Sequence, residues 1–484
     1  MSYNSRQKVL VSQETIPKLY DEESNLFKEP VSIASRPTSA KVRKIICGGL
    51  LCLGMLGLTI SFFETIWVSL WLWVVSYALL AAGITGSLWF SYRETGLEIK
   101  NDRTFFSGVT NRGIIAWFFA VIFTGFYGIL YWWPAYLDQL FRVVDPLSWV
   151  LAGQSADQWF LYGFLYTIAV LIFGFRSLIK YRNNRYHIFR TISVMMVQLI
   201  LAFILPQILR SLNEPEFYFS YFWPLKYEIL FPESVDNLIS DGNILGTFML
   251  YWGIIGSFLA TPILTYFYGK RWYCSWICGC GGLAETMGDP WRHLMPSSSM
   301  AWRIERGCIY TVLIIILLTT GFLWISSLSG GFLSPYAAIL KEWYGFYIGA
   351  IFAGVIGVGF YPILGSRIWC RFGCPMAAIL GIIQRFYSRF RITTNGGQCI
   401  SCGNCTTYCE MGIDVRSYAE RGENIVRASC VGCGVCSSVC PRGVLKLENG
   451  TSYRNRYPGS DKPLSAVLTA FKGGGCQSKG NSYL

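Results

Sequence analysis

Long apolar stretches alternate with shorter polar segments along most of the chain. A helix needs about 20 apolar residues to cross a hydrocarbon core about 30 Å thick. Because eight stretches come near this length, the pattern predicts a mainly α fold, a polytopic membrane helical bundle of about eight spans. We place these spans at residues 45–63, 66–90, 113–137, 158–179, 191–209, 245–268, 308–328 and 343–365.

The composition agrees with a membrane protein. Hydrophobic residues make up 53% of the chain and charged residues only 14%, too few to cover the surface of a soluble protein of this size. No Asp, Glu, Lys or Arg lies near the middle of a predicted span. Ion pumps usually keep such residues at mid-membrane, so the pattern disfavours a pump.

The basic residues indicate how the chain crosses the membrane. Most of the 41 Lys and Arg residues lie in the N-terminal arm and in the polar segments after every second span. The other polar segments hold only Arg142, Arg210, Lys226 and Lys341. The positive-inside rule then predicts a multi-pass protein of the bacterial cytoplasmic (inner) membrane with both termini in the cytoplasm. The net charge of +13 is explained by this topology and by attraction to anionic membrane lipid, without a nucleic-acid partner.

The polar and apolar blocks divide the chain into five expected parts. They are a cytoplasmic polar arm at 1–44, an N-terminal bundle of about five spans with an external acidic loop at 45–244, a transmembrane region with paired cysteine motifs at 245–390, a small α+β two-cluster ferredoxin domain of the bacterial type at 391–450, and a flexible C-terminal tail at 451–484.

Cysteine is the abundant metal ligand in this chain. It has 17 cysteines but only two histidines, His187 and His293. No Cys-x-x-Cys pair is followed by His, so covalent c-type haem is excluded, and we expect no haem. The soft thiolates point instead to iron–sulfur or other thiolate-bound metal.

The strongest motif follows the last span. Two runs of Cys-x2-Cys-x2-Cys-x3-Cys are typical of cubane iron–sulfur clusters, in which three close thiolates bind one cluster and the fourth comes from the other run. Glycines at 403, 432 and 434 permit the tight turns between ligands. We therefore predict two [4Fe–4S] clusters. Cluster I would take Cys399, Cys402, Cys405 and Cys440, and cluster II would take Cys430, Cys433, Cys436 and Cys409.

Other uses of these eight cysteines fit less well. Zinc ribbons use pairs of Cys-x2-Cys rather than two runs of four, and disulfides are rare on the cytoplasmic side. Glu410 follows Cys409 where ferredoxins often have Pro. This difference predicts that cluster II is more exposed or has an altered potential.

A second set of cysteines lies just past two spans, at the cytoplasmic surface of the membrane. The segments RWYCSWICGC and RIWCRFGCP place thiols three residues apart, so that each pair shares one face of a helical turn. Facing turns would hold a further iron–sulfur cluster, bind copper as Cu(I), or act as a dithiol pair; ordinary buried thiols are the simpler alternative. The members are Cys274, Cys278, Cys280, Cys370 and Cys374.

A ferredoxin cassette after a helical bundle, with paired Cys-x3-Cys elements, resembles the membrane polyferredoxins of the NapH, NosR and FixG type over roughly residues 245–445. Cys370 and Cys374 with Pro375 match the motif of these proteins, whereas Cys278 is followed by Gly279 and Cys280 instead of Pro. The resemblance implies quinol-dependent electron delivery to respiratory reductases, maintenance of nitrous-oxide reductase, or copper handling for haem–copper oxidases.

The predicted topology confines the grouped cysteines to one side of the membrane, so electrons need a quinone or a partner subunit to reach the other side. A quinone pocket or an interfacial belt would be formed by Trp272, Tyr273, Trp276 and Trp369.

We expect an electron-transfer subunit of an oxidoreductase complex, working with respiratory or redox subunits and relaying electrons through the two clusters. The alternatives are a maturation factor that reduces copper or thiols, and a scaffold with structural clusters.

Overall fold

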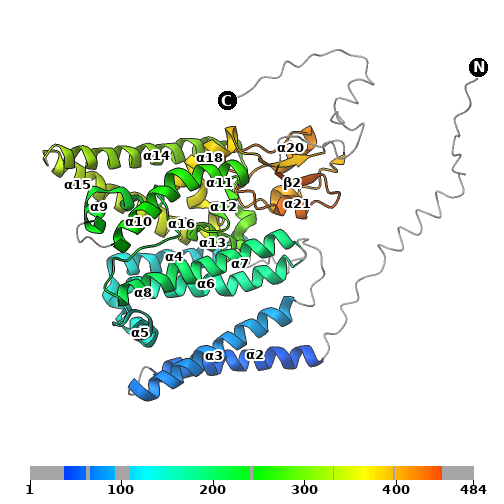
Figure 1. Ribbon diagram of the computed structural model, residues 1–484. Helices are drawn as coiled ribbons and strands as arrows, with labels where there is room; N and C mark the ends of the chain where they lie inside the picture. The colour runs from blue at the N-terminus through cyan, green and yellow to red at the C-terminus, as the bar shows by residue number, and fades with distance from the viewer. Residues whose placement is uncertain are drawn as a thin grey trace, which may run out of the picture.

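The computed structural model describes residues 38–61, 66–92, 110–182, 184–239, 244–330, 332–395 and 398–449. They form a bundle of helices with a small domain at one end (Figure 1). Most of the predicted N-terminal arm and the predicted tail, with Cys476, lie outside the described residues.

All the regular elements described in the first half of the chain are helices. In chain order its helices are α2 (Thr38–Ser61), α3 (Ile66–Tyr92), α4 (Ile114–Trp132), η2 (Pro134–Leu137), α5 (Asp138–Ala152), α6 (Gln158–Lys180), α7 (Arg185–Leu199), η3 (Ile200–Ile204), α8 (Leu205–Ser211), η4 (Tyr227–Leu230) and α9 (Pro232–Ile239).

The second half adds further helices and one pair of strands. They are α10 (Ile244–Ile255), η5 (Gly256–Ala260), α11 (Thr261–Tyr268), α12 (Arg271–Cys274), α13 (Gly279–Glu285), η6 (Asp289–Leu294), α14 (Ser299–Leu328), α15 (Ser334–Trp343), η7 (Tyr344–Ile356), α16 (Gly357–Gly359), α17 (Tyr361–Leu364), η8 (Trp369–Gly373), α18 (Pro375–Phe386), β1 (Phe390–Thr394), α19 (Asn404–Thr407), α20 (Val415–Arg421), α21 (Val435–Ser438) and β2 (Leu445–Asn449).

Among the described residues, seven helical segments are long and apolar enough to cross a membrane. Each coincides with a predicted span. The eighth prediction, 45–63, falls in α2, whose apolar stretch Ile45–Ile60 is shorter, so the structure supports seven membrane-length helices rather than eight. The seven are Trp71–Phe90, Ile114–Trp132, Gln158–Lys180, Arg185–Ser211, Ile244–Tyr268, Ser299–Leu328 and Ser334–Gly359.

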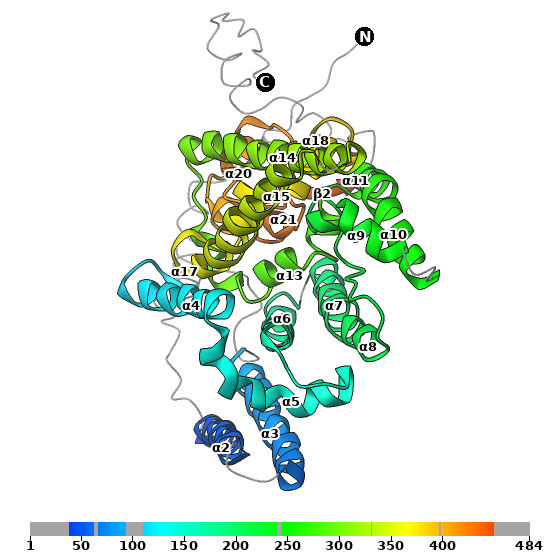
Figure 2. The same cartoon turned by 90° about the vertical axis from the view of Figure 1, so that its left-hand side faces the viewer.

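The long helices surround the short helix α13, which lies near the centre of the bundle when the molecule is viewed along the helices (Figure 2). Helices α2 and α3 pack as a pair at the edge of the bundle (Figure 1). The Trp73 indole of α3 donates a hydrogen bond to the Val143 carbonyl of α5. The segment that follows the first cysteine pair thus occupies the centre of the bundle.

The segment 212–231, predicted as part of an external acidic loop, folds back into the bundle. Its aromatic side chains at Phe217, Phe222 and Phe231 are buried. The backbone N–H of Trp223 donates to Ser257 Oγ at 2.9 Å. The segment therefore covers the interior instead of standing in solvent, because its aromatic positions supply more buried contact than its few carboxylates oppose.

The small domain contains the cysteine runs and a two-stranded sheet. Strands β1 and β2 are antiparallel, with Phe390 opposite Asn449 and Thr394 opposite Leu445. The domain joins the bundle directly, since the N–H of Arg389 donates to the carbonyl of Tyr266 at 2.9 Å. Gly269 has a φ of 67°, and a Cβ there would lie 2.9 Å from Phe390, so only glycine permits this close approach.

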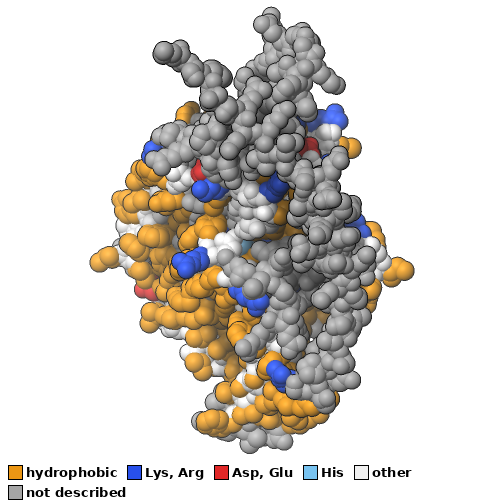
Figure 3. Space-filling view, turned by 90° about the vertical axis from the view of Figure 1, so that its right-hand side faces the viewer, with side chains coloured by type: hydrophobic (Ala, Val, Ile, Leu, Met, Phe, Trp, Pro, Cys, Tyr) orange, Lys and Arg blue, Asp and Glu red, His pale blue; other side chains and the backbone are white. Residues whose placement is uncertain are grey.

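Basic side chains mark the end of the molecule that carries the small domain, whereas hydrophobic side chains cover the flanks (Figure 3). This distribution matches a bundle whose flanks face lipid and whose basic end faces an aqueous phase.

A network of buried ion pairs links the helices beneath the small domain. Asp289, which is fully buried, accepts from Arg176 and Lys180 at 2.7 Å each and pairs with Arg292 at 3.1 Å. Burial alone would raise the pKa of Asp289, but Lys180 and the two arginines outweigh burial and hold that pKa far below its usual range. The carboxylate is therefore ionised and necessary to balance the cations.

Replacing Asp289 by Asn should destabilise the protein strongly. Removing one partner of a buried ion pair leaves uncompensated charge and costs on the order of 3 kcal/mol. We expect a lower midpoint of thermal unfolding for the detergent-purified protein, measured by tryptophan fluorescence. Glu233→Gln is the matched control, because Glu233 pairs with Lys341 at the surface and such pairs contribute little. Equal midpoints for the two variants would contradict the role given to Asp289.

Candidate functional site

Tight turns position the thiols of the two ferredoxin runs. Gly403, Gly432 and Gly434 have left-handed backbones with φ of 78°, 68° and 74°, as expected from their places between ligands. Helices α19 and α21, of four residues each, follow Gly403 and Gly434. In each run three cysteines thus lie at or before the start of the short helix, and the fourth lies beyond it.

Thiols of the two ferredoxin runs affect one another electrostatically. Burial raises the pKa of Cys405 to about 11, and the neighbouring thiols that raise it further are Cys402 and Cys440. Burial raises the pKa of Cys436 well above its usual value, with contributions from Cys433, Cys409, Cys430 and Cys405. The two runs therefore lie close together, as an exchange of the fourth ligand requires, and the division of the eight cysteines between two clusters stays a prediction.

The neighbourhood of cluster II differs from the prediction. Glu410 is fully buried, and so are Cys433 and Cys436. The Glu410 carboxylate pairs with Arg292 and with Arg367, at 3.1 Å each. The expected greater exposure was wrong: long-range ion pairs bury the glutamate that stands in place of proline. Burial alone would raise the pKa of Glu410, but the two arginines outweigh it and lower the pKa.

The two membrane cysteine pairs are built alike. The N–H of Cys278 donates to the carbonyl of Tyr273 at 2.8 Å, and the N–H of Cys374 donates to the carbonyl of Trp369 at 2.9 Å. Each Cys-x3-Cys pair is thus closed by a hydrogen bond to the residue just before it, five positions back. Each also ends at a helix start, with Cys278 capping α13 and Cys374 capping α18. The first pair spans the break between two short helices, not one continuous turn as predicted.

All five membrane thiols lie together. Burial raises the pKa of Cys374 well above its usual value, and Cys370, Cys278 and Cys274 raise it further. The Cys280 thiol donates a hydrogen bond to Cys278, which lowers the pKa of Cys278 and raises that of Cys280.

Among the described residues, no three His, Cys, Asp or Glu side chains converge on a point where one metal ion would sit. A cubane does not need such convergence, because each thiolate binds a different iron atom. Four buried thiols on facing turns fit a cluster of this kind, with Cys280 beside them.

Several polar contacts join the membrane thiols to the ferredoxin domain. Arg367 donates to Cys370 Sγ at 3.8 Å and also binds Glu285 and Glu410. Gln384 of α18 accepts from the N–H of Lys270 at 3.1 Å and donates to the Cys430 carbonyl at 2.7 Å. The thiols of both sets also share one continuous hydrophobic core. The two cysteine sets therefore belong to one packed unit.

A cavity of about 550 Å³ extends from the infolded segment 212–231 to the membrane thiols. Cys280 and Trp369 line it, and a smaller cavity of about 120 Å³ continues from the same two residues to Cys370. Tyrosine is the most frequent residue in the walls; Tyr166 donates to the Gly279 carbonyl at 2.8 Å. The tyrosines that line the larger cavity are Tyr131, Tyr162, Tyr166, Tyr218, Tyr221, Tyr227 and Tyr344.

The four aromatic residues that were predicted to form a pocket wall or an interfacial belt have different environments in the structure. Trp369 lines the cavity, whereas Tyr273 is fully buried and donates to the Ser220 carbonyl at 3.2 Å. Trp272 and Trp276 are partly buried and do not line the larger cavity. The prediction of an aromatic wall holds for Trp369 alone.

Two family models match the chain. Residues 398–445 match the 4Fe-4S dicluster domain, and residues 250–296 and 345–393 each match the 4Fe-4S binding domain. The second match covers both membrane cysteine pairs and reflects the repeated turn described above. The matches support iron–sulfur clusters as the cofactors of this chain.

Relatives share parts of the chain. YccM of Escherichia coli, whose name provisionally calls it an electron transport protein, is 29% identical over 154 residues, 30% of this chain and 43% of YccM. The uncharacterized protein MJ0749 of Methanocaldococcus jannaschii is 26% identical over 45% of this chain and 80% of its own length. The methylamine utilization ferredoxin-type protein MauN of Methylobacillus flagellatus is 23% identical over 34% of this chain and 56% of MauN.

The chain thus spans less than half of YccM and little more than half of MauN. No solved structure matches the chain. None of these comparisons tests the narrower resemblance to NapH, NosR and FixG, which stays a prediction.

Sequence reasoning missed the charged residues that join the two cysteine sets. Arg367 and Arg371 flank Cys370 within an otherwise apolar stretch, and this position was the available signal. Glu285 and Lys270 carried no comparable signal, since only the folded chain brings them to the thiols. The tyrosine wall was equally hidden, because its members come from four separate segments, α4, α6, 212–231 and η7.

Replacing Glu410 by Gln should raise the reduction potential of cluster II. The amide keeps the shape of the side chain but removes a negative charge beside Cys409, so adding an electron becomes easier. We expect an upward shift on the order of 60 mV, which corresponds to about 1.4 kcal/mol for one electron, in a redox titration followed by EPR. Glu420→Gln on α20, at an exposed ion pair, is the control. An unchanged potential in Glu410→Gln would contradict the electrostatic role of Glu410.

Proposed function

We propose that this protein is a membrane-anchored iron–sulfur electron-transfer subunit. It relays electrons between a cytoplasmic donor and the membrane thiol site through two [4Fe–4S] clusters. The ligands are Cys399, Cys402, Cys405 and Cys440 for cluster I, and Cys430, Cys433, Cys436 and Cys409 for cluster II.

The observation that carries this proposal is the direct packing of the two cysteine sets. Electron transfer slows steeply with distance, so a relay needs its centres within one rigid body. Gln384 bridges the backbones of Lys270 and Cys430, and Arg367 touches both Cys370 and the glutamate next to Cys409. These contacts hold the ferredoxin domain against the membrane site.

We assign Cys274, Cys278, Cys370 and Cys374 to a third iron–sulfur cluster. The support is the repeated turn, the burial of all four thiols, and the match of both segments to the 4Fe-4S binding domain. The Arg367 guanidinium donates to Cys370 and would offset the negative charge of such a cluster. When bound, the cluster supplies a one-electron centre at the floor of the tyrosine-lined cavity.

The tyrosine-lined cavity is the place where the relay would exchange electrons with a second redox partner. Quinone fits it as a redox partner, because its walls are aromatic and carry hydroxyl groups that donate to carbonyl oxygens. Gln207 Oε1 and Trp369 Nε1, both buried, make no hydrogen bond among the described residues and line this cavity. A quinone there would carry electrons toward the outer side, which the protein's own thiols do not reach.

One observation favours a second function, reduction of copper or of thiols during maturation of a respiratory enzyme. Cys280 is a fifth thiol, hydrogen-bonded to Cys278 and facing the cavity. A relay needs only four thiols per cluster, whereas a thiol exposed to a cavity suits Cu(I) transfer or disulfide exchange.

Replacing Cys370 by Ser should abolish the EPR signal of the membrane site and leave the two ferredoxin signals intact. Serine removes one thiolate ligand but keeps the size of the side chain. Cys308→Ser is the control, since Cys308 is exposed on α14. If Cys370→Ser left every signal unchanged, the membrane cysteines would not ligate a cluster.

Cys280→Ala separates the relay from the maturation factor. For a relay, we expect unchanged iron content and unchanged EPR signals, because Cys280 is no cluster ligand. Copper binding or a reducible disulfide that is present in the wild-type protein and absent in Cys280→Ala would favour maturation instead. Metal analysis and thiol titration of the two purified proteins provide the measurement.

A further inference from the structure

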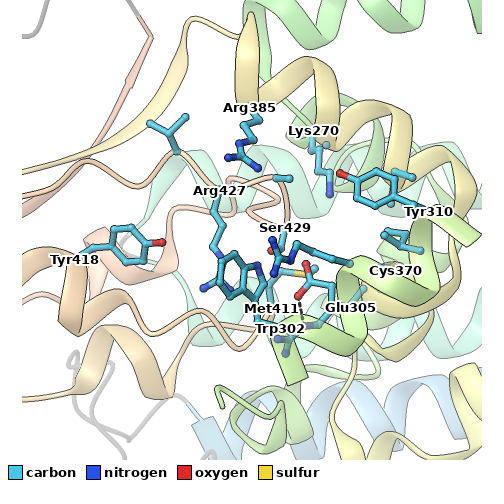
Figure 4. Close-up of a pocket in the computed structure, with 18 residues that line it drawn as sticks. Lys270, Trp302, Glu305, Tyr310, Cys370, Arg385, Met411, Tyr418, Arg427 and Ser429 are labelled. Carbon is cyan, nitrogen blue, oxygen red and sulfur yellow. Dashed lines mark hydrogen bonds and ion pairs between the residues drawn. The ribbon is translucent and has the colours of Figure 1, made fainter. Parts of the chain in front are cut away.

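A separate cavity of about 230 Å³ lies where the ferredoxin domain meets α14 and α18. Cys370 lines one side of it, but the seven tyrosines of the larger cavity do not, and the proposed relay assigns no role to the basic residues around it. Figure 4 shows the charged and aromatic side chains gathered around this space, among them Lys270, Trp302, Glu305, Arg385 and Arg427.

Positive charge dominates this cavity. Among the described residues that line it, Glu305 has the only carboxylate, and Arg371 binds that group at 2.7 Å. The remaining four cations make no ion pair with any described residue. They are Lys270, Arg306, Arg385 and Arg427. Like charges that converge without counterions repel one another, so the cavity favours an anion.

Lys270 is the deepest of these cations. Only 2% of its surface is exposed, and its ammonium lies near Gly381 of α18. A buried ammonium without a carboxylate partner is costly. Clusters bound at Cys274 and Cys430 would offset part of this charge, since the field of Lys270 reaches both thiols.

The arginines are arranged around one indole. The guanidinium of Arg306 lies 4.2 Å from the Trp302 ring centroid, and that of Arg427 lies 4.7 Å from it. The Nε atoms of both arginines are buried and make no hydrogen bond with described residues. Both guanidinium groups thus lie beside the same ring with an Nε donor that no described residue uses, and guanidinium donors of this kind suit phosphate oxygens.

We propose that this cavity binds a phosphate group. The chemistry is common to two sources, the headgroup of an anionic phospholipid and a soluble phosphate compound. Exposed apolar side chains at Ile304, Ile382 and Phe386, on the two helices that border the cavity, would accommodate acyl chains.

The test measures binding to the full-length detergent-purified protein with two probes. Native mass spectrometry follows retention of phosphatidylglycerol against phosphatidylcholine, and calorimetry follows inorganic phosphate. We expect selective retention of phosphatidylglycerol, binding of phosphate, or both.

In the double variant Arg306→Gln and Arg427→Gln, binding should weaken about tenfold, the equivalent of about 1.4 kcal/mol. Retention of phosphatidylglycerol alone identifies a lipid site, and binding of phosphate identifies a site for soluble phosphate compounds.

The control is the double variant Arg416→Gln and Arg421→Gln, which removes the same charge from the exposed helix α20. The visible absorption of the clusters checks that both variants are folded. The proposal is overturned if the wild-type protein binds neither probe. It is equally overturned if the two double variants lose binding to the same extent, because net charge alone would then explain the affinity.

Discussion

Charged groups buried at the joint between the membrane helices and the ferredoxin domain constrain the rest of the structure. Arg367, Arg292 and Arg190 are fully buried, and a buried charge is tolerated only when it is paired. Their partners come from distant parts of the chain, Glu285 from α13 and Glu410 from the first cysteine run. The ferredoxin domain therefore cannot move away from the bundle without leaving several charges unpaired. A tethered, freely moving electron carrier is excluded by this cost.

The same joint shapes the environment of the thiols. Arg367 contacts Cys370, and the fields of Arg190 and Arg292 reach Cys433. Thiolates that bind a cluster bring negative charge into a buried region, and fixed arginines offset it without any reorganisation when an electron arrives. The negative charge of Glu410 opposes this offset, but only at the thiols of cluster II, next to Cys409. The arginines thus stabilise both the assembly of the two domains and the charge of the centres between them.

How much of this was predictable from the sequence depends on the range of the interactions. The cysteine runs from Cys399 to Cys440 and the glycines within them are local patterns; the match to the 4Fe-4S dicluster domain covers the runs, and the structure confirms the left-handed glycines. The spans were predictable because length and hydropathy are local properties too. The burial of Glu410, the infolding of 212–231 and the tyrosine wall depend on contacts between segments far apart in the chain. No periodicity or spacing encodes such contacts, and the exposed cluster II expected from Glu410 failed for this reason.

The repeated turn explains why a membrane protein would bury five thiols beside a cavity. Cys278 and Cys374 are each held by a hydrogen bond five residues back, and each starts a helix that enters the packed interior. Two copies of one local turn therefore supply the four thiols that we assign to a third cluster. Cys280 has no counterpart in the second copy of the turn, because Gly279 and Cys280 follow Cys278 where the second copy has Pro375 and Met376. This difference places a thiol at the wall of the cavity, so the residue that distinguishes the two copies is also the one that a molecule bound in the cavity would contact.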